Sequence, residues 1–325
     1  MSVTERLDAF QQRHPAAGYP LAVFYKFFDD QGNYLAALIA YYAFISLFPL
    51  IFLLTTVLGY VLVGNHQLQD TVLNSALGQF PAIGDQLQHP ERMGGGPVAV
   101  LIGVLGSLYG ASGVAQAVQH AMNTAWGVPR NNRPNPFVAR GRSLLLIGTI
   151  GLAVIGITVL SVLGRYAGAF GIKGTGLGTL VFVATVLLYA LTFVVAFRLA
   201  CARPLSVREV APGALAAGLF LELLQVFGAT FVTRVVARAS IINGVFALVL
   251  GLLAFLYLAA VAIVFCVEVN VVRVDTLYPR ALLTPFTDNV DLTAGDRRAY
   301  STQAEAQRSK GFEQVDVSFH PEEEG

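Results

Sequence analysis

The chain alternates between long apolar runs and short polar segments. Between Asp30 and Asp70 there is no Asp, Glu, Lys or Arg, and the uncharged run from Tyr34 to Val63 is 30 residues long. About 20 apolar residues suffice to cross the hydrocarbon core of a bilayer. A helix on the surface of a soluble domain would show a polar face, which this run lacks. The pattern therefore predicts a membrane protein.

Six apolar runs, each bounded by charged residues, predict an all-α polytopic fold with six transmembrane helices. These spans are about 34–63, 98–125, 143–164, 177–197, 210–233 and 245–272, within a membrane domain over 34–273. Residues 1–33 precede it, and the amphipathic pattern of 20–33 predicts a helix lying on the membrane surface, with Lys26, Asp29 and Asp30 on its polar face. Residues 66–88 predict one or two further short interfacial helices, with an ordinary loop as the alternative.

The placement of basic residues predicts the orientation of these spans. Twelve Lys and Arg lie in the N-terminal segment, the second and fourth connections and the start of the tail, against five on the opposite side. Cytoplasmic loops carry the excess of Lys and Arg, so both termini are expected inside the cell. The densest patch is the second connection, with Arg130, Arg133, Arg140 and Arg142, where contact with anionic lipid is also expected.

Composition supports a membrane protein and sets the tail apart. Hydrophobic residues make up 55% of the chain and charged residues 13%, and the mean hydropathy is +0.63. Residues 1–273 carry a net charge of +6 and residues 274–325 a net charge of −5. The polar, acidic tail over 274–325 is expected to be largely disordered and cytoplasmic. Cys201 and Cys266, both flanked by apolar residues, indicate no disulfide framework.

Two carboxylates fall within predicted spans. Glu222 lies near the middle of the fifth span, with Gln225 on the same helical face, and an acid at that depth must face protein or water or be protonated. Glu268 lies towards the cytoplasmic end of the sixth span, where it could snorkel, pair with a basic residue or cap a helix. Functional and structural roles both stay open for these residues.

The first span contains a second group of candidates. Pro49 removes a helical hydrogen bond and is expected to kink or loosen the helix, and Ser46 could satisfy the freed backbone group. A kink beside Tyr41 and Tyr42 would either shape a cavity or serve packing. The small residues of spans two and three, including the Gly106–Gly110 pair, favour close packing within the chain or in a homodimer.

Several classes of function find no support in the sequence. The five histidines have no second His or Cys at ligand spacing, so no metal site and no cofactor are expected. No P-loop, GxSxG or dinucleotide fingerprint is present, which argues against an enzyme and against an ATP-driven pump.

Four segments resemble the YihY/BrkB family of bacterial inner-membrane proteins. They are Ala40-Tyr41-Tyr42-Ala43 with Ser46-Leu47-Phe48-Pro49, the basic stretch from Arg130 to Arg142, Ala211-Pro212-Gly213-Ala214, and Gly244 to Asn270. The first string is fairly specific, the others are weak alone, and Phe255 stands where the family often has Trp. The resemblance implies a six-helix protein of the bacterial cytoplasmic membrane linked to envelope integrity, in some members to export of lipid or lipopolysaccharide precursors.

The family once carried a ribonuclease label, but here the loop arginines lack adjacent acids or histidines, so no nucleic-acid partner is expected. The first functional hypothesis is therefore an ATP-independent permease for lipid or small solutes, with membrane lipids as partners. Its path would run along spans one, five and six, past Glu222 and Gln225, with Arg234 and Arg238 at the outer mouth. The alternative is a non-transporting scaffold that docks envelope proteins through its tail.

Overall fold

The computed structural model describes residues 3–61, 97–169, 175–234, 241–285 and 290–319. Within these ranges the chain forms α-helices and one 3-10 turn and no strand, which confirms the predicted all-α class. The helices are α1 (Val3–Arg13), α2 (Pro15–Asp29), α3 (Gly32–Val61), α5 (Pro97–Ala125), α6 (Pro136–Ala169), α7 (Thr175–Ala200), α8 (Val207–Arg234), α9 (Ile241–Val274) and α10 (Ala294–Ala306), and the turn is η2 (Arg130–Asn132).

Six of these helices, α3 and α5 to α9, coincide with the six predicted spans. Three described segments are long and apolar enough to cross a membrane: Pro136–Leu163, Gly178–Ala200 and Val249–Val274. A shorter apolar stretch, Gly32–Leu47, begins α3. The predicted count of six is compatible with this arrangement. The predicted outer helices over 66–88 lie outside the described residues.

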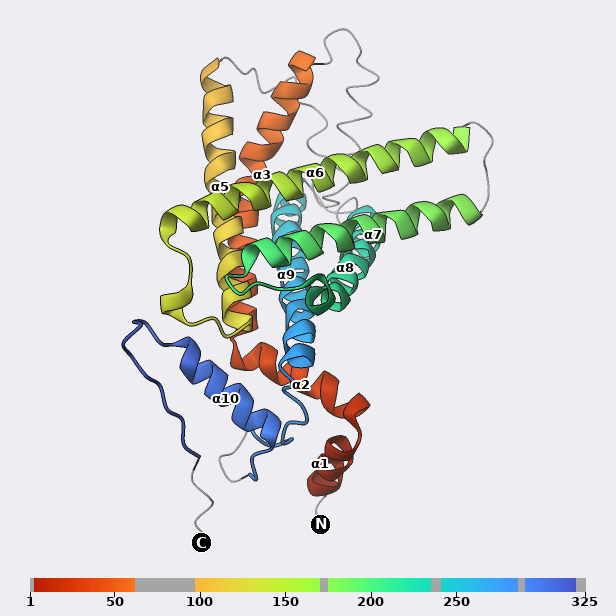
Figure 1. Cartoon of the computed structure of the whole chain (residues 1–325). Helices are drawn as coiled ribbons and strands as arrows, with labels where there is room; N and C mark the ends of the chain where they lie inside the picture. The colour runs from red at the N-terminus through yellow and green to blue at the C-terminus, as the bar shows by residue number, and fades with distance from the viewer. Residues whose placement is uncertain (1–2, 62–96, 170–174, 235–240, 286–289, 320–325) are drawn as a thin grey trace.

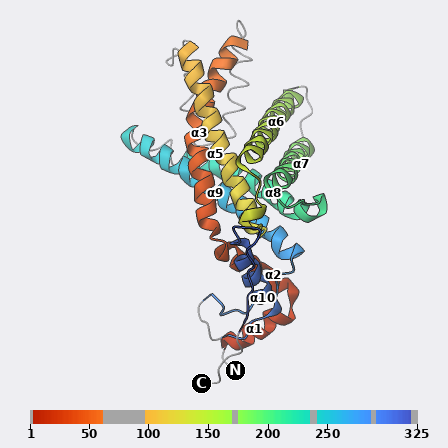
Figure 2. The same cartoon turned by 60° about the vertical axis from the view of Figure 1, so that its left-hand side comes forward.

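The helices form two groups joined by α9. Figures 1 and 2 both show α3 and α5 running side by side, and α6 and α7 running side by side as a second pair that crosses the first. Helix α9 packs against α3 on one side and against α8 on the other, and α8 also packs against α7. Asn270 of α9 fixes the second contact: it accepts from the Gly213 amide (2.8 Å) and donates to the Val210 carbonyl (3.1 Å) of α8. The polar amide thus joins two apolar helices.

Glycines of α5 allow α3 to approach closely. A Cβ atom added at Gly110 or Gly113 would collide with Ser46 or Tyr42 of α3, and one added at Gly106 would lie only 3.0 Å from Pro49. Small residues at such a contact let two backbones pack at short range. Close helix packing, one of the two roles expected for these glycines, is therefore the one that the structure shows within the chain. On α6, by contrast, Gly148 and Gly151 face open space.

Helices α1, α2 and α10, together with residues 275–285, lie at one end of the helix bundle, below α3 and α9 in Figure 1. We call this end the base. On α2, Phe24 and Phe28 are exposed, as expected for a surface helix, but Lys26 and Asp30 are buried. The polar side of this helix is therefore covered by α9 and α5, and the position of 20–33 on the membrane surface stays a prediction.

The chain after α9 also differs from the expectation of a largely disordered tail. Residues 294–306 form α10, which begins with a capping box between Thr293 and Asp296. Arg280, only 1% exposed, donates to Asp296 (2.5 Å) and to Asp29 (3.0 Å), and so joins α10 to α2. A buried arginine and a helix cap order this part of an acidic tail, despite its polar composition.

Candidate functional site

The predicted path residues lie at separate places in the structure. On α3, Tyr42, Ser46 and Pro49 face the glycines of α5, while Tyr41 is exposed and stacks edge-on with Tyr42 at 5.4 Å. The Ser46 hydroxyl donates to the Ala43 carbonyl at 2.9 Å. The carbonyl that it satisfies is therefore not the one at Ile45, which Pro49 leaves free.

Glu222 and Gln225 lie on α8, where it packs against α7. Gln225 donates to the Tyr189 hydroxyl of α7, and partly exposed Glu222 lies one turn earlier on the same helix. Arg234 ends α8, and Arg238 falls outside the described residues. Helix α9 separates this polar group from α3. The role of these residues in a substrate path stays a prediction.

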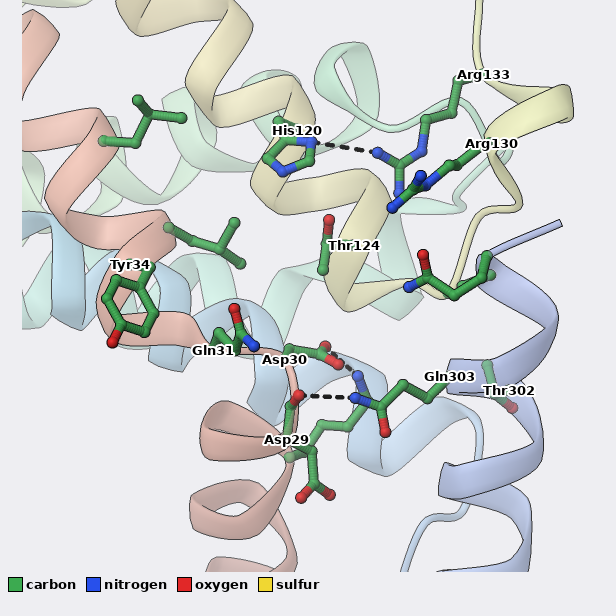
Figure 3. A pocket seen from close by; sticks show the side chains of 16 residues that line it. Asp29, Asp30, Gln31, Tyr34, His120, Thr124, Arg130, Arg133, Thr302 and Gln303 are labelled. Carbon is green, nitrogen blue, oxygen red and sulfur yellow. Dashed lines mark hydrogen bonds and ion pairs between the residues drawn. The ribbon is translucent and has the colours of Figure 1, made fainter. Parts of the chain in front are cut away.

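An open cleft of about 520 Å³ lies where the base meets the bundle. The corner between α2 and α3, the end of α5, η2 and α10 all contribute to its walls (Figure 3). The lining residues are Lys26, Asp29, Asp30, Gln31, Tyr34, Leu35, Leu38, His120, Thr124, Gly127, Arg130, Arg133, Thr302, Gln303, Ala306 and Gln307. Segments far apart in the sequence therefore build one polar site beside the apolar start of α3.

One wall of this cleft is cationic. The Arg133 side chain donates through Nε to the Val128 carbonyl (3.2 Å) and lies 3.2 Å through Nη1 from His120 Nδ1. Since a guanidinium can only donate, His120 Nδ1 must be the acceptor. Figure 3 shows the Arg130 side chain beside that of Arg133. Neither arginine forms an ion pair with any described residue, so two positive charges face the cleft without a counter-ion.

The acids on the opposite wall already have cationic partners. Asp29 pairs with Arg280 at 3.0 Å, and its backbone carbonyl accepts from Gln303 at 2.8 Å. Asp30 forms a close ion pair with Lys26. Threonine and glutamine side chains complete this wall. An anion in the cleft would therefore meet two guanidinium groups without an ion-pair partner among the described residues, and acids that each already pair with a cation.

Behind Asp30 lies a buried cluster of Lys26, Asp30 and Glu268, which we call the buried ion cluster. The Lys26 ammonium donates to Asp30 and to the Ala125 carbonyl (3.2 Å), and it lies 3.9 Å from Glu268. Burial disfavours its charge, but Glu268 and Asp30 outweigh this effect and raise the pKa of Lys26 above its usual value. Burial also raises the pKa of Asp30, against the lowering influence of Lys26. Pairing with a basic residue was one of the roles predicted for Glu268.

The sequence predicts the arginines of the cleft only as a topological and lipid-facing patch, and Asp29 and Asp30 only as part of the polar face of a surface helix. It predicts no site at His120 or Gln303. No spacing in the sequence links the cleft residues, because they come from four separate segments: the corner between α2 and α3, the end of α5, the stretch around η2, and α10. Among the described residues, no group of three His, Cys, Asp or Glu could hold a metal ion.

Comparison with known proteins places the chain in a family. No curated protein and no solved structure matches it significantly. The family model described as "Virulence factor BrkB" matches residues 23–285, which span α2 to the start of the tail and include most of the cleft. This range contains all four segments that resemble the YihY/BrkB family, and that resemblance is thereby confirmed. The chain belongs to the BrkB virulence factor family of membrane proteins.

Proposed function

We propose that this protein is an ATP-independent phospholipid transporter of the bacterial inner membrane, and that its cleft receives the phosphate of a lipid headgroup. The observation that supports this proposal is the pair Arg130 and Arg133, which line an open cleft and have no ion-pair partner in the part of the chain that the structure describes. Adjacent like charges repel each other, and an anion between them would remove that cost. Guanidinium groups bind phosphate through two parallel hydrogen bonds, which makes phosphate the favoured anion.

The surroundings of the cleft fit an amphiphile better than a free solute. Tyr34 is 68% exposed and Leu38 39% exposed, and both line the cleft on the side of α3. The apolar stretch Gly32–Leu47 continues from there along α3. A lipid could therefore place its phosphate on the arginines and its acyl chains along this helix, at the level where headgroups meet hydrocarbon.

The base is proposed to face the cytoplasm. Three of the segments that the sequence predicts on one side contact one another: Arg142 donates to the Cys201 carbonyl (3.0 Å), Arg203 pairs with Asp275 (3.2 Å), and the Asn131 amide donates to the Arg308 carbonyl (3.2 Å). Their excess of basic residues favours the cytoplasmic side. The cleft would then open to the inner leaflet, whose anionic lipids attract each basic side chain by about 1 kcal/mol.

The intramembrane pair Glu222 and Gln225 is proposed as a second point of the path, deeper in the bilayer. A partly exposed acid on α8 offers a polar contact to a headgroup that crosses between leaflets. The alternative of a scaffold rests on the end of the tail, where Phe312 is 89% exposed and offers a docking point for another protein. We place it second, because α10 itself lines the cleft.

The test is transbilayer movement of fluorescent phospholipids in proteoliposomes. We expect the wild type to move lipid and the double variant Arg130→Gln/Arg133→Gln to lose that movement. The control Arg140→Gln/Arg208→Gln removes two exposed arginines that do not line the cleft, and it should behave as the wild type. Glu222→Gln tests the deeper part of the path and should also lose movement while remaining folded.

Two results would contradict the proposal. A folded wild-type protein that moves no more lipid than empty vesicles would exclude transport of phospholipid. Equal movement by the Arg130→Gln/Arg133→Gln variant and its control would exclude the cleft as the headgroup site.

A further inference from the structure

The buried ion cluster holds two acids, Glu268 and Asp30, against a single cation, Lys26. Glu268 is 0% exposed, and neither of its carboxylate oxygens has a hydrogen-bond partner among the described residues. The nearest cation is the Lys26 ammonium, at 3.9 Å. A buried carboxylate with no hydrogen bond is strongly disfavoured in its ionised form.

Lys26 forms its hydrogen bonds with groups other than Glu268. Its ammonium donates to the Asp30 carboxylate and to the Ala125 carbonyl, which uses two of its three N–H groups. The charge of Lys26 therefore balances Asp30. If Glu268 were ionised as well, the cluster would carry one uncompensated negative charge on a carboxylate that is 0% exposed.

No other described charge balances Glu268. From the base, Arg280 is engaged by Asp29 and Asp296. From α9 and α8, Arg273 donates to the carbonyls of Arg208 and Glu209 and is exposed. From α5, His120 is held by Arg133 on the cationic wall of the cleft, and α10 contributes the uncharged Gln303.

We infer that Glu268, with Asp30 and Lys26, forms a proton-binding site, which holds one proton on its two carboxylates at neutral pH. Protonation of Glu268 leaves Lys26 and Asp30 as a neutral pair and removes the excess charge. A metal cation is a poorer occupant, because the Lys26 ammonium already lies within 3.9 Å of both carboxylates and would repel it. The raised pKa values of Asp30 and Lys26 agree with a charged lysine and a retained proton.

This site borders the cleft. Lys26 and Asp30 are part of the cleft wall, whereas Glu268 lies behind them. When the proton leaves, Glu268 competes with Asp30 for the ammonium, so the wall of the cleft has to rearrange. Loss or uptake of a proton is thereby linked to the shape of the cleft, whatever the cleft binds.

The proton can be observed directly by infrared spectroscopy of the full-length protein in lipid, without any transport assay. We use the Glu222→Gln background, which removes the other intramembrane acid. The carbonyl stretch of a protonated carboxylic acid should be present at neutral pH and disappear on alkaline titration.

Three further variants locate the proton. Adding Glu268→Gln should abolish the band. Asp30→Asn should abolish it as well, because Lys26 is then free to neutralise an ionised Glu268. Lys26→Met should strengthen the band, since both acids must then be neutral.

The outcomes decide the proposal even if one variant fails to fold. Absence of the band at neutral pH in the Glu222→Gln background would overturn it. A band that survives both Glu268→Gln and Asp30→Asn would place the proton elsewhere and would also overturn it. Loss of the band when Na⁺ replaces choline at constant pH would identify a sodium site instead. None of these results depends on lipid movement, so failure of the transport proposal would leave this test intact.

Discussion

Replacing Arg280 by methionine is expected to release α10 from the base while the membrane helices stay folded. Arg280 is 1% exposed, and its guanidinium joins Asp296 of α10 to Asp29 of α2. Tyr300 of α10 adds a ring contact at 5.3 Å from the guanidinium carbon. Methionine fills much of the same volume but removes the charge, and Asp296, itself 0% exposed, loses its cation.

The burial of these charged groups determines the free-energy cost of replacing Arg280. Removing one partner of a buried ion pair costs about 3–5 kcal/mol, because the other charge stays buried. The Asp29 side chain is 22% exposed, so water solvates part of its carboxylate after Arg280 is replaced. The expected cost is therefore near the lower end, at about 3 kcal/mol. A cost of about 3 kcal/mol raises the population of undocked α10 about 100-fold, and 5 kcal/mol would raise it about 4,000-fold.

Limited proteolysis of the folded protein in detergent measures this population, because cleavage follows the open fraction when opening and closing are fast. A protease of broad specificity should cut within 290–306 at least about 100 times faster in Arg280→Met than in the wild type. Arg297→Met is the matched control, since Arg297 is exposed and its guanidinium has no ion pair with any described residue and lies 5.9 Å from the ring of Phe319. Surface changes stay within about 0.5 kcal/mol, or about twofold in rate. If Arg280→Met is cut no faster than Arg297→Met, the anchoring role of Arg280 is refuted.

Two further predictions concern the membrane helices, and thermal unfolding in detergent checks both. Gly110→Val should destabilise the α3–α5 contact by about 1–3 kcal/mol through overpacking against Ser46. Gly148→Val adds its side chain in open space and should leave the midpoint unchanged or slightly raised, because valine has a better helix propensity than glycine. Equal midpoints for the two variants would contradict the packing account. Asn270→Ala should lower the free energy of unfolding by about 1–3 kcal/mol, because the buried Gly213 amide loses its acceptor. The control Asn132→Ala, on the surface, should leave the midpoint unchanged. An unshifted midpoint for Asn270→Ala would show that the Asn270 side chain does not hold α8 to α9.

The positions of the helices could be predicted from the sequence because lipid offers no hydrogen-bond partners to the backbone. Every peptide group in the hydrocarbon core must bond within its own segment, so an uncharged run of membrane length has to be a helix. The predicted span 98–125 and the observed Pro97–Ala125 differ by one residue for this reason. The role of the glycines on α5 was also foreseeable, although their partner helix was not.

The cleft could not be predicted, because it depends on which segments meet. Asp30, Arg130 and Gln303 are separated by about a hundred residues or more along the chain, and no periodicity relates them. The pattern around Lys26 and Asp30 correctly indicated a helix with a polar side. The pattern could not show that Glu268 of α9 packs against that polar side and that Lys26 and Asp30 are therefore buried.

The tail illustrates a different limit. Its acidic, polar composition favours disorder, since few apolar residues are available to bury. The local signal for a helix was nevertheless present in Thr293 and Asp296, three residues apart, which form the capping box of α10. What composition could not reveal is the buried Arg280, whose charge gives the short helix a fixed place on the base.

The most direct test of the central claim locates a bound headgroup in the cleft. A phospholipid with a photoreactive group beside its phosphate is crosslinked to the protein in membranes, and the adducts are mapped by peptide mass spectrometry. We predict adducts in residues 26–38 and 120–133, strong in the wild type and in Arg140→Gln/Arg208→Gln, and lost in Arg130→Gln/Arg133→Gln. Adducts spread over the exposed faces of α6 and α7, in equal amounts in all three proteins, would contradict a headgroup site in the cleft.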